Sequence, residues 1–246
     1  MVLRADRERT VSVVAGVVTL MVLLGYVALS DSPIAVQARG LVGAEDRLAP
    51  EVAADSTGSY AFLHTTRGGD PVGFSPCEPV RYLVNPQGAP SGWEEQIDDA
   101  VQEIEDRTGL VFDYLGTTDD RAFDDRLDAG GNPEPVLIGW ADSAEVGDLA
   151  DDVAGLGGPT MIGRGRLQAY VTGIVVLDRD VTDDLADAPQ GGAAMRGLLL
   201  HELGHLVGLA HVDDPGELMY PRGTLRSEFG PGDLAGLSRI GAVPCR

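Results

Sequence analysis

Residues 198–211 read LLLHELGHLVGLAH, and this stretch decides the fold of the chain because it sets three histidines at fixed spacings. An α-helix advances about 100° and 1.5 Å per residue, so His201 and His205 project from one helix face. His211 would point roughly 120° away from His205 if the helix continued. Gly208 lies where a turn is needed, since glycine tolerates positive φ and commonly ends helices. The spacing therefore predicts a helix that ends at Gly208 and a chain that brings His211 back to the other two histidines.

A metal site is favoured over a pair of buried core histidines on a leucine-rich helix. Three of the four histidines of the chain fall within this stretch, and the fourth, His64, is far away in sequence. His64 is most simply a polar residue on a strand. The chain therefore offers one histidine-built site, made of His201, His205 and His211, and we expect it to hold one metal ion.

Three imidazole ligands with an open fourth position are typical of a catalytic zinc site, because structural zinc usually has four protein ligands. Zinc lowers the pKa of a bound water toward about 7, which makes a nucleophile at neutral pH. Glu202 is not needed as a ligand and is placed to accept the proton of that water as a general base. The stretch therefore predicts a zinc-dependent hydrolase.

These residues resemble the metzincin zinc metallopeptidases. The residues that match the extended zinc signature of that group are His201, Glu202, His205, Gly208 and His211. Met219 lies eight residues past His211, in a segment similar to the metzincin Met-turn, and the Met219-Tyr220-Pro221 form is most similar to the matrixin branch.

The resemblance extends over about residues 77 to 246 and implies the fold and several residue roles. It implies an α+β domain with a mixed twisted sheet, a long active-site helix and a small C-terminal subdomain. It also implies that Met219 forms an apolar floor under the metal and that Pro221, with the two residues after it, lines the specificity pocket. We assign Tyr220 no ligand role, because the position at which astacin-like relatives carry a metal-binding tyrosine is Pro221 here.

The composition suits one medium-sized catalytic domain with extra segments. The chain has 246 residues, an apolar content of 43% and a formal net charge of −21. This acidity disfavours nucleic acid and anionic lipid as partners. The resemblance implies that the chain is a zinc-dependent endopeptidase and that its substrate is a protein or peptide bound in extended form.

The N-terminal region predicts a membrane anchor. Residues 11–29 carry no charge, and as a helix they would span about 28 Å, close to the hydrocarbon core of a bilayer. The arginines within residues 1–10 mark the cytoplasmic side, which places the remainder outside. A cleaved secretory signal is the alternative, although its apolar core is usually shorter. Residues 30–58 have no sustained period and indicate a flexible tether, so the folded domain is expected over 59–246.

The rest of the chain alternates between strand and helix patterns. We expect strands at 60–65, 80–84, 110–115, 135–141 and 173–177. Residues 91–109 predict an amphipathic helix capped by Ser91, with Trp93 and Trp140 in the core. Residues 154–161 are either a glycine loop or the edge strand that pairs with substrate in related enzymes. The acidic stretch 178–187 is expected to be a loop.

Two further features of the sequence concern metals and cysteines. Asp178, Asp180, Asp183 and Asp184 offer oxygen ligands, but they do not fit an EF-hand, so calcium stays a possibility without assigned ligands. Cys77 and Cys245 are the only cysteines and lie in the part expected outside the membrane. They predict a disulfide worth roughly 4 to 5 kcal/mol in the chain-entropy model. The alternative is a free Cys77 thiolate that inhibits the zinc and leaves Cys245 unpaired.

Two other functional classes stay open. One is a membrane-tethered zinc-binding interaction domain without turnover, and the other is a zinc hydrolase that acts on cell-wall amide bonds. The presence of Glu202 argues against the first class, because a structural zinc needs no general base.

Overall fold

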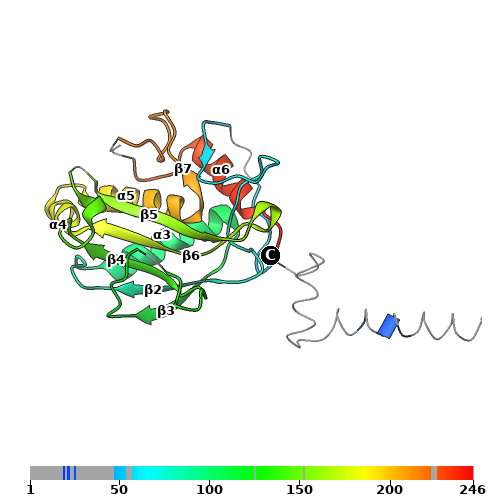
Figure 1. Ribbon diagram of the computed structural model, residues 1–246. Coiled ribbons are helices and arrows are strands. Elements are labelled where there is room, and N and C mark those ends of the chain that lie inside the picture. The colour runs from blue at the N-terminus through cyan, green and yellow to red at the C-terminus, as the bar shows by residue number, and fades with distance from the viewer. Residues whose placement is uncertain are drawn as a thin grey trace, which may run out of the picture. The chain divides into compact units, whose positions relative to one another are not determined.

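The computed structural model describes residues 47–53, 57–124, 126–151, 153–222 and 226–245, together with Thr19, Met21, Val22 and Gly25. Residues Arg47–Pro244 form one compact unit, and residues 1–46 with the last two residues form another. The account below concerns the first unit (Figure 1).

A five-stranded mixed sheet is the centre of this unit. Its strand order is β3-β2-β4-β6-β5. The parallel strands are β2 (Val80–Asn85), β3 (Phe112–Thr117), β4 (Val136–Ala141) and β6 (Ala169–Asp178). Strand β5 (Gly155–Ile162) runs antiparallel to β6 at one edge. All six residues of β4 are buried, as expected for an apolar run in the middle of a sheet that is covered on both faces.

Helices cover one face of the sheet. Helix α3 (Trp93–Thr108) and helix α5 (Gly191–Val207) pack against each other and against this face, and α6 (Pro231–Gly241) packs on α3 (Figure 1). The opposite face is covered by loop residues, among them Phe123 and Leu149, which form a smaller apolar cluster with β4 and β6. Almost every residue in the second half of α5 is buried, because sheet, α3 and α6 all contact it.

Most of the predicted elements are confirmed. Strands β2, β3, β4 and β6 appear where the sequence placed them, although β6 is longer than the predicted 173–177. Of the two alternatives for residues 154–161, the structure shows the edge strand β5 rather than a glycine loop. Trp140 is fully buried and Trp93 packs against the core.

Two local predictions were wrong. Ser91 does not cap α3, because the capping position is Gly92 in a left-handed conformation (φ 79°) with no side-chain cap. The acidic stretch 178–187 is not a loop but helix α4 (Arg179–Asp187), which leads into α5. Asp178 caps α4 by accepting a hydrogen bond from the N–H of Val181 at 2.9 Å, and acidic side chains near a helix N-terminus are stabilising.

Part of the predicted tether packs on the folded unit. The Arg47 side chain donates to the carbonyl of Gly241 at 2.7 Å, and the Ser238 hydroxyl donates to the carbonyl of Val52 at 2.7 Å. The compact unit therefore begins at Arg47, earlier than the expected start near Ser59.

The predicted membrane segment 11–29 lies outside the described residues except for four isolated positions. Among the residues that are described, no helix combines the length and the apolar character that crossing a bilayer requires. Both cysteines of the chain, Cys77 and Cys245, are disulfide-bonded, which confirms the predicted disulfide and rules against a free Cys77 thiolate.

Candidate metal centre

The turn at Gly208 is built as the sequence predicted. Helix α5 ends at Val207, and Gly208 follows with φ 123°, a value that residues other than glycine rarely adopt. The N–H of Gly208 donates to the carbonyls of Gly204 and His205, which closes the last turn of the helix. The chain then reverses direction through β7 (Leu209–Ala210), and His211 follows directly after this strand.

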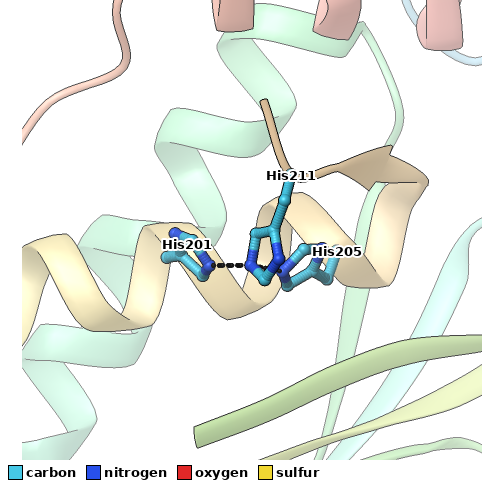
Figure 2. A group of neighbouring side chains, drawn as sticks. All are labelled: His201, His205 and His211. Carbon is cyan, nitrogen blue, oxygen red and sulfur yellow. Dashed lines mark hydrogen bonds between the residues drawn. The ribbon is translucent and has the colours of Figure 1, made fainter. Parts of the chain in front are cut away.

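The three histidines meet at one point (Figure 2). The Nε2 atoms of His201 and His211 are 3.0 Å apart, and those of His205 and His211 are also 3.0 Å apart. His201 and His205 come from α5, and His211 approaches from the segment after the turn. Within the described part of the chain, these are the side chains grouped closely enough to hold a metal ion.

Backbone carbonyls fix the orientation of two of the rings. The Nδ1 of His201 lies 2.8 Å from the carbonyl of Leu218, and the Nδ1 of His205 lies 2.8 Å from the carbonyl of Leu209. Since a carbonyl only accepts, each Nδ1 carries the proton, and each Nε2 presents a lone pair to the common point. These two lone pairs and the Nε2 of His211 lie close enough together to hold one metal ion, so the three residues fit a zinc ion.

The surroundings keep the imidazoles neutral, as metal ligation requires. Burial lowers the pKa of His205 to about 4, with the nearby His201 contributing in the same direction. Burial also lowers the pKa of His201 and of His211.

Glu202 is buried between α5 and the edge strand β5. Only 4% of its surface is exposed, and burial raises the pKa of its carboxyl to about 8, while a hydrogen bond from the backbone of Gly157 acts in the opposite direction. A Cβ on Gly155 would lie 2.9 Å from the Glu202 side chain, and a Cβ on Gly157 would lie 2.1 Å from its carbonyl oxygen. The two glycines therefore let β5 approach α5 at this residue. The sequence reasoning identified Glu202 but assigned no role to the glycines.

Substituting alanine for Gly157 is expected to destabilise the folded chain by about 1–3 kcal/mol, the usual cost of overpacking a core. The added methyl would overlap backbone atoms of Glu202, so β5 or α5 must move. The matched control is Gly158→Ala on the same strand, where a Cβ would meet nothing within 4 Å. Urea unfolding of both zinc-free variants measures the effect. Equal stabilities for the two variants would contradict this packing.

Met219 lies under the helix turn that carries the first two ligands. It is buried, and a Cβ on Gly204 would lie 2.8 Å from its Sδ. The apolar floor under the metal that the resemblance implied for Met219 stays a prediction. Pro221 is exposed and follows at the end of the turn, whereas the last residue of the expected specificity segment, Gly223, lies outside the described residues.

Two buried carboxylates that the sequence reasoning missed connect the Met219 turn to α6. Glu217 accepts from the N–H groups of Gly232 and Asp233 at 2.9 and 3.0 Å, which caps α6 from a distant segment. Asp233 in return accepts from the N–H groups of Leu218 and Gly230 at 2.5 and 2.9 Å. The carbonyl of Leu218 is also hydrogen-bonded to the Nδ1 of His201, so the hydrogen bonds between this turn and α6 help to position a proposed metal ligand. The capping position itself is Gly230, which has no side chain, so the distant Glu217 supplies the carboxylate that accepts from the first N–H groups of α6.

Residues 139–234 match the sequence profile of a family described as Matrixin. No curated protein matches the chain significantly. Among solved structures, the archaemetzincin of Methanopyrus kandleri is similar, with 16% identity, a TM-score of 0.42, and coverage of 65% of this chain and 93% of that one. The matched segment contains the three histidines, Glu202 and Met219, so the chain is similar to the matrixins over residues 139–234.

Proposed function

We propose that this chain is a zinc endopeptidase that hydrolyses internal peptide bonds of extracellular proteins or peptides, with Glu202 as the general base. The observation that carries the proposal is the convergence of three Nε2 atoms, two of which keep a lone pair because carbonyls are bonded to the Nδ1 atoms of their rings. The residue after the first of these histidines is Glu202, a buried carboxylate.

His201, His205 and His211 would hold the zinc ion. When bound, zinc supplies Lewis acidity, which makes a water more acidic and polarises the carbonyl of the scissile bond. The carbonyls of Leu218 and Leu209 keep the rings of His201 and His205 in the ligating orientation.

Glu202 transfers the proton of the attacking water in the proposed reaction. Its carboxylate accepts the proton of the attacking water and then donates it to the nitrogen of the leaving amine. Burial raises the pKa of Glu202 to about 8, so its carboxylate binds a proton more strongly than an exposed glutamate does. The packing of Glu202 against Gly155 and Gly157 limits the positions that the carboxyl can take.

The edge strand β5 would bind the substrate. It pairs with β6 on one side, and no other described strand pairs with it. An extended peptide can therefore add to the open edge as a further strand, by main-chain hydrogen bonds that depend little on side chains. Because β5 also packs on α5 beside Glu202, a peptide docked there lies near the proposed base.

The location of the protein is part of the proposal. The uncharged segment 11–29 would anchor the chain, with residues after it outside, where the disulfide of Cys77 and Cys245 is stable. Mass analysis of the N-terminus of the purified protein tests the anchor. A mature chain that begins near Asp31 and is recovered without detergent would replace the anchor by a cleaved signal.

Incubation of the zinc-loaded full chain with a diverse peptide library tests the activity. Mass spectrometry of the products is expected to show cleavage at internal bonds, which stops when a chelator removes zinc and returns when zinc is restored. Release of terminal residues alone would make the protein an exopeptidase. A library left intact by the zinc-loaded chain would refute the proposed activity.

A further inference from the structure

A short strand near the start of the folded unit pairs with the segment that carries the third histidine. Strand β1 (Ala61–Phe62) runs antiparallel to β7, with Ala61 opposite Ala210 and Phe62 opposite Leu209. The N–H of Leu63 extends this ladder by donating to the carbonyl of Gly208 at 2.9 Å. In Figure 1, β1 is the short cyan arrow beside β7. All three residues between α5 and His211 are therefore paired with a segment about 150 positions earlier in the chain.

A second contact holds the same turn from β6. A Cβ on Gly208 would lie 2.9 Å from a ring carbon of the buried Tyr170. The hydroxyl of Tyr170 is hydrogen-bonded to Nδ1 of His64 at 3.0 Å, and the carbonyl of His64 accepts from the N–H of Val72. Gly208 is thus enclosed between Tyr170 and the segment that contains Leu63, His64 and Val72.

His211 depends on this enclosure more than the other two histidines do. His201 and His205 are held by α5 itself and by carbonyls bonded to their Nδ1 atoms. The Nε2 of His211 lies 3.0 Å from the Nε2 atoms of the other two rings, and within the described residues no backbone carbonyl is hydrogen-bonded to its Nδ1. The position of its ring is therefore set by the backbone on either side of it. Residues 208–210 are held by β1 and Leu63, and the N–H of Val212 donates to the carbonyl of Met219.

We propose that Leu63, through its backbone N–H, and the strand β1 position His211 for zinc, so that the segment 61–63 sets the zinc affinity of a site from which it contributes no ligand. Tyr170 is a second positioning residue in the same arrangement. The proposal rests on the zinc-binding part of the proposed function. It assigns a role to residues 61–63, which lie outside both the histidine stretch and the Matrixin match over 139–234.

The pair Leu63→Pro and Leu63→Ala tests the proposal in the full chain. Proline removes the N–H that donates to Gly208, whereas alanine keeps it and only shortens a side chain that is 37% exposed. Competition with a zinc chelator is expected to show a 10- to 100-fold loss of affinity for Leu63→Pro, the usual effect of losing a group that orients a ligand. Leu63→Ala is expected to stay within about twofold of the parent.

A different pattern is expected if β1 only stabilises the fold. Leu63→Pro would then lower the melting temperature of the zinc-free chain without changing the zinc affinity of the folded form. Cobalt substitution adds a direct readout, because the visible absorption of Co²⁺ depends on the arrangement of its ligands. Leu63→Pro is expected to change that spectrum, and Leu63→Ala is expected to keep it. An unchanged affinity and spectrum in a folded Leu63→Pro chain would overturn the proposal.

Hydrogen exchange of the unmodified chain decides the matter if Leu63→Pro does not fold. Coupling between two events is reciprocal, so zinc must stabilise the β1–β7 pairing by the factor by which the pairing strengthens zinc binding. Zinc is expected to slow exchange of the Leu63 amide by 10- to 100-fold and to leave the Glu134 amide, which donates to Arg126, nearly unchanged. A zinc-binding chain with no added protection at Leu63 would refute this proposal alone, whereas a chain that binds no zinc would refute the proposed function.

Discussion

Replacing Glu202 with glutamine is expected to lower the rate of peptide hydrolysis by about 10²- to 10⁴-fold while one zinc stays bound per chain. Glutamine has nearly the same shape as glutamate, so the packing against Gly155 and Gly157 is retained. What is lost is a carboxylate that can accept and return a proton. Steady-state cleavage of a peptide found in the library, with metal analysis of the same sample, measures both quantities.

The matched control for this prediction is Glu95→Gln. Glu95 is an exposed acid in the first turn of α3, so the change removes the same charge at a distance from the histidines. Its cleavage rate is expected to equal that of the parent. If the Glu202 variant cleaved as fast as the control, Glu202 would not be the general base.

Replacing His205 with alanine is expected to abolish both zinc binding and cleavage. The ring of His205 contributes one of three Nε2 atoms at the common point and is almost fully buried, so water cannot easily substitute for it. The parent should gain about 2.7 kcal/mol of stability at a zinc concentration 100 times the dissociation constant, and the variant should gain none. Metal analysis and urea unfolding with and without zinc measure the two effects.

His64→Ala serves as the comparison, because His64 is the histidine of the chain that lies outside the cluster. This variant is expected to retain one zinc per chain when zinc is saturating. A His205 variant that still bound one zinc as tightly as the His64 variant would show that the metal is held elsewhere.

Local sequence patterns predicted the parts of the site that depend on local geometry. His201 and His205 are four residues apart on one helix, and Gly208 adopts the positive φ that the return of His211 requires. Both facts follow from helix periodicity and from the conformational freedom of glycine. The central strands were likewise predictable, because buried parallel strands are continuous apolar runs.

Contacts between distant segments were not predictable in this way. Glu217 caps α6 although it is 15 residues from Gly232, and Leu63 binds Gly208 across most of the chain. Such pairs leave no periodic pattern in the sequence. The glycines of β5 were ambiguous for a related reason. Gly155 and Gly157 could indicate a loop, but their positions lack room for a Cβ because Glu202 lies so close to them.

The acidic stretch before α5 shows how one residue can reverse a local prediction. Its high content of aspartate suggested a solvated loop, but Asp178 ends β6 and caps α4 at the same time. A capped start with acids in the first turn is sufficient for a short helix that packs on α5.

Titration of zinc into the chelator-treated full chain, with the rate of peptide cleavage recorded at each addition, tests the central claim most directly. The predicted result is a rate that rises in proportion to added zinc and stops rising at one zinc per chain, since His201, His205 and His211 form one site. A chain that binds one zinc without gaining any cleavage, or that cleaves equally well with no zinc, would contradict the account.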